Sequence, residues 1–283
     1  MITRFVTISV GILPLFILAE ANTLQAMDVP KADEAAVECC QPSSRDVRQH
    51  LQNADRLYAQ FKPKEASKEL HKVLQADPSN VEAILKLCRA QIDIGDMIPE
   101  SAQDWKETRL KEYTKAEDYA RKAVVLNPNS TWSYFYLAAS LGNIAVLSPR
   151  DKQIGLAGDV RTAVEKSIAL DPANGFAYHV YGVWQRKMAE IGSASRVFAS
   201  LVYRQSIPTG SLEKSIEYLK KAVALNPSVI VSRLELAKSY LAVENLPSAR
   251  NLLASIRKLP IQFSDDARHK KEAEELLEQI KDR

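Results

Sequence analysis

Ala169-Leu170-Asp171-Pro172, followed by Tyr178-x-x-Tyr181-Gly182-x-Trp184, is the stretch that decides the fold. It has the form of a helix that ends in an Asp-Pro turn and a second helix that starts a few residues later. Proline ends the first helix because it has no amide hydrogen and clashes with the preceding turn. Glycine lets a neighbouring helix approach closely. The same join recurs at residues 75–78, 125–128 and 224–227. Four copies of one join predict a repeat protein.

Composition fits a water-soluble helical array and argues against several classes of function. Of the 283 residues, 46% are hydrophobic and 26% are charged. Nine glycines are too few for a glycine-rich nucleotide loop or a turn-dense all-β fold. The 38 basic and 35 acidic side chains give a net charge of +3, which is too balanced to indicate nucleic acid or an anionic membrane as the main partner. Basic pairs such as Arg186-Lys187 are interpreted as solvated helix faces.

The first residues predict a secretory signal at 1–21. Arg4 supplies a basic start, residues 5–18 are uncharged and apolar, and Ala19-Glu20-Ala21 is an Ala-x-Ala cleavage site. The alternative is an uncleaved membrane anchor, but the apolar run has about 15 residues where a spanning helix needs about 20. We therefore expect cleavage and a periplasmic or secreted protein. A protein anchored in the membrane by this segment is the alternative.

Residues 22–46 predict a mobile tether. They are short of large apolar side chains and contain Pro30 and Pro42, so they bury too little surface to offset their chain entropy. Cys39 and Cys40 lie in this segment. In an oxidising compartment they could cross-link chains or partners, and the alternative is an incidental pair.

Residues 47–283 predict an all-α solenoid of tetratricopeptide-type helical hairpins, with about five units and a C-terminal capping helix. The joining prolines recur at intervals wider than the 34 residues of that repeat. The excess falls between the first helix (A) and second helix (B) of a unit, at 96–112, 147–157 and 188–210, which predicts long A-to-B insertions. Beyond Leu259-Pro260, an apolar stripe on a charged helix fits a cap that closes the last hydrophobic surface. The stripe consists of Ala273, Leu276, Leu277 and Ile280.

The second half also resembles a particular family. Its features are Gly182-x-Trp184, a long connection at 196–209, a Leu-Lys-Lys-Ala-x-x-Leu-x-Pro run at 219–227, Leu-Ala-Lys-Ser-Tyr at 236–240 and an acidic, Leu-rich final helix. In this order they resemble the regulator of microtubule dynamics family. That resemblance implies an all-helical, non-enzymatic adaptor, and animal members are linked to microtubules and to organelle tethering. A cleaved signal would place this chain outside the cytosol, so we carry over the fold and the adaptor role. An uncleaved anchor would restore the tethering role.

No motif predicts an enzyme, a cofactor or a metal. The sequence has no Gly-x-Gly-x-x-Gly, Gly-x-x-x-x-Gly-Lys, His-Glu-x-x-His or Gly-x-Ser-x-Gly. His50, His71, His179 and His269 are dispersed, and no Cys-x-x-Cys accompanies them, which argues against zinc. Cys88 takes a small-residue position on a helix A, where a buried thiol packs like alanine.

The concave groove, lined by helix A side chains, is the predicted binding surface for a protein or peptide. Aromatic anchors beside basic groups suit an extended or helical segment with acidic and apolar side chains. The alternative is that the insertions or the C-terminal helix fill this groove. A groove that grips chaperone C-termini is disfavoured, because Leu51 and Asp55 replace its Lys and Asn. Tyr178, Tyr181, Gly182 and Trp184 are interpreted as helix-packing residues. The predicted groove residues are Trp132, Phe135, Asn143, Phe176, His179, Arg186, Lys187, Leu234 and Lys238.

Overall fold

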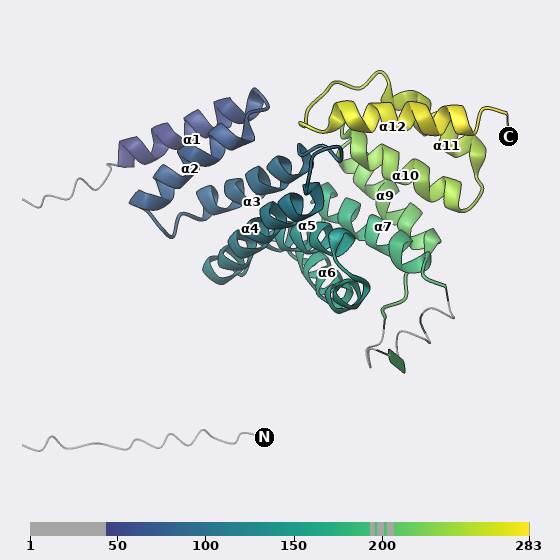
Figure 1. Ribbon diagram of the computed structural model, residues 1–283, viewed down its shortest axis with the longest axis horizontal. Helices are drawn as coiled ribbons and strands as arrows, with labels where there is room; N and C mark the ends of the chain where they lie inside the picture. Colours follow the sequence, from purple (N-terminus) through teal and green to yellow (C-terminus); the bar gives the residue numbers. More distant parts are fainter. Residues whose placement is uncertain (1–43, 193–195, 197–200, 203–206, 283) are drawn as a thin grey trace, which may run out of the picture. The chain divides into compact units, whose positions relative to one another are not determined.

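The computed structural model describes residues 44–192, 196, 201–202 and 207–282, which belong to one packed unit, Gln41–Arg283 (Figure 1). The described residues form helices and no strand, which confirms the all-α prediction. The predicted signal, most of the tether, Cys39 and Cys40 lie outside the described residues. In the part of the chain that is described, no helix is long and apolar enough to cross a membrane. The helices are α1 (Ser44–Ala59), α2 (Pro63–Ala76), α3 (Val81–Asp96), α4 (Trp105–Leu126), α5 (Thr131–Leu147), α6 (Arg150–Leu170), α7 (Gly175–Ala189), α9 (Leu212–Leu225), α10 (Ile230–Ala242), α11 (Leu246–Ile256) and α12 (Asp266–Gln279).

The helices pack as hairpins, which confirms the predicted tetratricopeptide-type arrangement. The hairpin pairs are α1 with α2, α3 with α4, α5 with α6, α7 with α9, and α10 with α11. The first helices of successive units also touch, α3 against α5, α5 against α7, and α7 against α10. We call the side of the unit that these first helices form the helix-A face. The last helix, α12, packs on both α10 and α11, as expected of a cap.

Three of the four Asp-Pro or Asn-Pro joins end one helix and start the next with the same geometry. At the deciding stretch, the amide of Asp171 donates to the carbonyl of Ser167 and closes α6. Three residues later, Oδ1 of Asn174 accepts from the amide of Ala177 at 3.2 Å and caps the start of α7. Asn80 and Ser130 cap α3 and α5 in the same way. A side-chain oxygen thus satisfies one of the free amides at the start of these three helices, whereas α10, after the fourth join, begins without a side-chain cap.

One predicted insertion is almost entirely helical and does not form a long connection. Residues 147–157 were expected to connect two helices, but α5 extends to Leu147 and α6 begins at Arg150. The extra length is helical because Ile154, Ala157 and Val160 recur at helical spacing and are all buried. In the second unit, residues 97–104 precede α4, and the rest of the expected insertion forms its first turns.

The aromatic stretch that opens α7 lies in the core, as expected of packing residues. Tyr181 and Trp184 join a buried cluster with Val160 and Val164 of α6. Nε1 of Trp184 donates to the carbonyl of Ala157 at 2.9 Å. The predicted structural role of these aromatic residues is therefore confirmed.

Gly182 and Cys88, two small residues that the sequence predicts to pack between helices, are both buried. A Cβ added to Gly182 would lie 2.5 Å from Cγ of Leu219, so α7 and α9 approach more closely there than an alanine allows. Cys88 is fully buried, and burial raises the pKa of its thiol. Both positions serve packing, since a buried thiol behaves as a small hydrophobic group.

Candidate functional site

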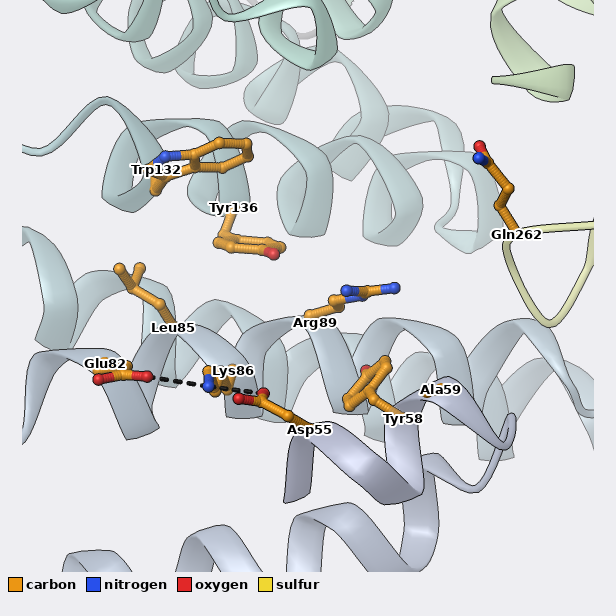
Figure 2. A pocket seen from close by; sticks show the side chains of 10 residues that line it. All are labelled: Asp55, Tyr58, Ala59, Glu82, Leu85, Lys86, Arg89, Trp132, Tyr136 and Gln262. Atoms are coloured by element: carbon orange, nitrogen blue, oxygen red, sulfur yellow. Dashed lines mark hydrogen bonds and ion pairs between the residues drawn. The ribbon is translucent and has the colours of Figure 1, made fainter. Parts of the chain in front are cut away.

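A hollow of about 480 Å³ opens on the helix-A face between α1, α3 and α5. Figure 2 shows Trp132 and Tyr136 on α5 facing Leu85 and Arg89 on α3 across this space. Of the predicted groove residues, Trp132 alone lines it. The remaining lining comes from α1 and α3 of the first two units, from Tyr136 on α5 and from Gln262 before α12, and none of these was predicted for the groove. The other lining residues are Asp55, Tyr58, Ala59, Glu82, Lys86 and Gln262.

The charges in this hollow balance one another. Nζ of Lys86 lies 2.6 Å from Oδ1 of Asp55 and 2.9 Å from Oε1 of Glu82. Burial disfavours the charge of Lys86, but the hydrogen bonds to the two carboxylates outweigh it and raise the pKa of the ammonium group. The guanidinium of Arg89 lies 4.3 Å from the ring centroid of Tyr58, and its Nε lies 3.7 Å from Oδ2 of Asp93. Two cations therefore face carboxylates of their own chain.

Aromatic rings continue from the hollow along the helix-A face. The ring centroids of Trp132 and Phe135 lie 5.7 Å apart, and those of Phe135 and Phe176 lie 5.9 Å apart. Phe263, from the segment before α12, meets Phe176 edge-on at 6.2 Å. The structure thus brings together the three aromatic residues predicted for the groove. The contributions of Tyr136 and Phe263 were not foreseen, and Tyr136 lies one position beyond Phe135 on the same helix.

In the described structure, the basic side chains predicted to bind a partner in the groove pair with acidic side chains of the chain itself. Arg186 is 5% exposed and pairs with Glu235 and with Glu190, the latter at 3.1 Å. Leu234 is fully buried in the core of the last unit, so its assignment to the groove is wrong. Lys238 lies 2.8 Å from Glu235. Arg186 and Lys238 pair with acidic neighbours within the chain because a buried cation needs a partner.

The structure places three further predicted groove residues without testing their role in binding. His179 is partly buried, and burial lowers its pKa to about 4. Its Nδ1 lies 3.2 Å from Oγ of Ser232. Lys187 is exposed, with Nζ 3.5 Å from Oε2 of Glu190, and Asn143 is partly buried. Their role in binding stays a prediction.

The C-terminal arm, defined here as residues 261–282, covers part of the helix-A face. Besides the contact with Phe176, the ring of Phe263 lies 5.5 Å from the guanidinium of Arg89. Glu272 on α12 pairs with Lys238 on α10 at 2.6 Å. At α7 the contact comes from Phe263 in the segment before α12, whereas α12 itself packs on α10. The alternative that the C-terminal helix fills the groove is therefore supported at α10.

Two half-buried carboxylates lie near the end of α3, close to this arm. Burial raises the pKa of Asp93 to about 7, although the cationic Arg89 opposes the shift. Burial likewise raises the pKa of Asp96 to about 6, although Asp96 accepts a hydrogen bond from the hydroxyl of Tyr113 at 2.6 Å. The negative charge of Asp265 on the arm raises both pKa values further.

Among the described residues, Asp265, Asp266 and His269 form the cluster that offers metal-ligand atoms, which lie within 4.8 Å of one another. These side chains already contact other groups of the chain. Oδ2 of Asp266 accepts from the amides of Gln262 and Phe263 at 2.7 and 2.8 Å, and Arg268 lies 3.3 Å from Nε2 of His269. A neighbouring guanidinium opposes a cation, so the cluster serves the start of α12.

Comparison with known proteins places the chain among named relatives. The family described as "Regulator of microtubule dynamics protein 1-3" matches residues 50–281. Regulator of microtubule dynamics protein 1 of Bos taurus is 24% identical over 240 residues, which cover 84% of this chain and 73% of that protein. The Homo sapiens protein of the same name is 26% identical over 193 residues, which cover 68% of this chain and 60% of that protein, less than two thirds of its length.

A solved structure supports the fold alone. A thermophilic TPR protein of Thermus thermophilus superposes with a TM-score of 0.58 at 18% identity. The match covers 80% of this chain and 98% of that one. The described chain thus has a tetratricopeptide-like architecture.

Proposed function

The chain belongs to the regulator of microtubule dynamics family, and from this membership and the geometry of its helix-A face we propose that it is a non-enzymatic scaffold for protein partners. The partner segment binds in the hollow between α1, α3 and α5. The observation that carries this proposal is the set of aromatic walls that line the hollow, Tyr58, Trp132 and Tyr136. Aromatic side chains supply large contact area at low entropic cost and dominate binding energy at protein interfaces.

The chemistry of the hollow favours a partner segment with one large apolar anchor. Its volume of about 480 Å³ lies within the usual range of pockets that enclose a ligand group. Trp132 is 40% exposed, so an anchor that covers it gains buried area. The side chains of Asp55 and Glu82 are each 59% exposed and can exchange Lys86 for a charged group of the partner. Because the charges balance, apolar contact and not net charge sets the affinity.

The test uses the full chain and peptides selected against it from a random library. We expect Trp132→Ala and Tyr136→Ala each to weaken binding of the selected peptides by about tenfold or more, as loss of an interface anchor does. Val125→Ala on α4 is the matched control, because Val125 is 80% exposed on a helix B that does not line the hollow. Helical circular dichroism should be unchanged in all three variants. Equal affinity of the peptides for all of them would contradict the proposal.

The names of the relatives favour a second candidate, a tether of the microtubule-regulator type. The chain spans 60% of the human relative, so any activity of that whole protein is only a proposal for this chain. Co-sedimentation of the full chain with polymerised microtubules tests it directly. Pelleting that depends on microtubule concentration would favour this candidate, and a chain that stays in the supernatant would remove it.

Location separates the two candidates further. We propose that residues 1–21 are removed and that the mature protein is periplasmic or secreted. Determination of the N-terminal residue of the protein from its native host tests this. A start near Asn22 or Met27 supports the proposal, and retention of Met1 supports the membrane-anchored alternative.

A further inference from the structure

The guanidinium of Arg89, in the wall of the hollow, contacts two aromatic rings. Its central carbon lies 4.3 Å from the ring centroid of Tyr58 and 5.5 Å from that of Phe263. The backbone that carries Phe263 is itself fixed, because the buried carboxylate of Asp266 accepts from the amides of Gln262 and Phe263 at 2.7 and 2.8 Å. These contacts restrict the guanidinium before a partner arrives, which reduces the entropy that is lost on binding.

The N–H donors of Arg89 have no hydrogen-bond acceptor in the described part of the chain. The carboxylate of Asp93 lies 3.7 Å from Nε, which is beyond hydrogen-bond distance. By contrast, Arg109 and Arg233 each donate to a backbone carbonyl, at 2.6 and 2.8 Å. The side chain of Arg89 is 40% exposed, and in Figure 2 its terminal nitrogens point along the hollow towards the side where Gln262 lies. Its outer edge therefore offers parallel N–H groups to a molecule in the hollow.

We propose that Arg89 binds the carboxylate of an Asp or Glu side chain in the partner segment, beside the apolar anchor that covers Trp132. This inference rests on the proposed function and names the chemistry of the partner. The pair forms through two parallel N–H···O bonds, a geometry that a carboxylate matches and a single neutral carbonyl does not. The anchor and the acid lie on one side of the segment, about two residues apart if it is extended and about three or four apart if it is helical.

The charges around Arg89 leave room for one further negative charge. Asp55 and Glu82 share Lys86 as their partner, and each of the two carboxylates is 59% exposed, so water screens them. Burial raises the pKa of Asp93 to about 7, so at neutral pH part of this group is protonated and does not compensate the guanidinium. A phosphate with two charges meets more repulsion from these acids than a carboxylate with one, so the carboxylate fits better.

The inference changes which residue reads the acidic group of the partner. The sequence predicted a partner with acidic and apolar side chains, bound by basic groups that include Arg186 and Lys238. Both of these cations pair with acidic side chains of their own chain. Arg89 supplies the basic group instead. A free chain terminus is not the expected source of the carboxylate, because Leu51 and Asp55 replace the Lys and Asn that grip it.

The experiment compares acidic and amide forms of peptides that bind the full chain. Peptides are selected from the random library with their C-termini joined to the carrier, so that only side chains supply carboxylates. Each selected peptide is then synthesised with both ends capped, once as selected and once with its acidic residue changed to the corresponding amide. Fluorescence anisotropy at low ionic strength gives the ratio of the two dissociation constants. The receptors are the wild-type chain, Arg89→Gln, Arg89→Lys and Arg121→Gln.

Arg121→Gln is the matched control for loss of one positive charge. Arg121 lies on α4, its side chain is 54% exposed, and it pairs with Glu117 away from the hollow. Loss of long-range attraction alone therefore affects both glutamine variants. Arg89→Lys keeps the charge but lacks the planar fork that forms two parallel bonds. Helical circular dichroism checks that all the variants are folded.

We expect the selected peptides to be enriched in Asp or Glu at the stated spacing from the anchor. The amide form should bind the wild-type chain about threefold to tenfold more weakly, as expected for a charge-assisted pair on a partly exposed arginine. Arg121→Gln should keep this ratio, Arg89→Gln should reduce it to about one, and Arg89→Lys should fall between them. Because the amide change is in the peptide, the wild-type ratio tests the proposal even if Arg89→Gln does not fold.

Equal affinity of the two peptide forms for the wild-type chain, absence of acid enrichment, or a ratio that Arg89→Gln leaves unchanged would each overturn this inference. A full ratio in Arg89→Lys would overturn the two-bond geometry. If affinity depends on Trp132 but not on the acidic residue, the inference fails and the scaffold proposal stands. If the acid preference requires Arg89 but affinity does not depend on Trp132, the anchor site is wrong and the carboxylate assignment remains. A library that yields no binder removes both.

Discussion

Replacement of Gly182 by alanine tests how closely α7 and α9 pack. A Cβ at this position would lie 2.5 Å from Cγ of Leu219 and 3.2 Å from its backbone nitrogen. Leu219 is fully buried, so its side chain cannot move aside without disturbing the core. The carbonyl of Gly182 also accepts from Oγ of Ser215 on α9 at 2.8 Å, which ties the two helices at the same level.

The magnitude follows from two opposing terms. Alanine is favoured over glycine in a helix interior by about 1 kcal/mol. Overpacking of a close-packed core costs about 1–3 kcal/mol. Gly182→Ala should therefore lower the free energy of unfolding by up to about 2 kcal/mol. Gly158 in α6 is the matched control, because a Cβ there meets nothing within 4 Å. Only the helix term applies to Gly158→Ala, so it should raise stability by about 1 kcal/mol.

Thermal unfolding followed by circular dichroism measures both variants. For a domain of this size, 1 kcal/mol corresponds to a change in Tm of about 2–4 °C. Because repeat arrays can unfold in parts, amide hydrogen exchange in α7 and α9 should accompany the scan. If both substitutions raise Tm by the same amount, the close approach of α7 and α9 is refuted.

Three further predictions concern buried polar groups. Arg186→Ala removes one of the two cations that pair with Glu235, while Lys238 remains, and should cost about 1–3 kcal/mol in urea unfolding. The exposed neighbour Lys187→Ala should change stability by less than about 0.5 kcal/mol. Trp184→Phe removes the hydrogen bond to the carbonyl of Ala157 and should cost about 1–3 kcal/mol, seen as a lower Tm. Burial raises the pKa of Asp93 to about 7 in the folded chain, against about 3.9 when unfolded, so between these values the folded state holds the extra proton. This group's contribution to the free energy of unfolding therefore falls as pH rises from about 4 to 7, and Asp93→Asn should remove that dependence in urea titrations at several pH values; an unchanged pH profile would show that Asp93 titrates normally.

The repeat architecture could be predicted because its signals are local. Each Pro join places a helix end and a cap within a few residues, and Asp171 and Asn174 take these roles in the structure. The insertion after α5 differs from its prediction, because the wide spacing of the joining prolines does not show whether the extra residues are helical. Gly155 and Gly158 suggest a loop locally, but burial of Ile154 and Ala157 outweighs their low helix propensity. Tertiary packing decided the outcome there.

The candidate site was predicted only where it depends on helix register. The spacing of Trp132 and Phe135 places them on one side of α5, and the structure brings their rings together with Phe176. The contact between Arg89 and Phe263 joins residues from opposite ends of the array. It depends on how far each unit rotates relative to the previous one, and no local pattern in the sequence encodes that rotation.

The cap explains why the two halves of the helix-A face differ. A final helix must cover the apolar surface of α10 and α11, and α12 does so with the side that carries Ala273 and Ile280. Its other side must be strongly charged to face water, and the acidic Glu272 on it meets Lys238. Closing the array thus neutralises a basic group of the last unit as a consequence of capping. At the hollow the arm contributes Gln262 and the nearby ring of Phe263, and Trp132 stays 40% exposed, so partner recognition should begin there.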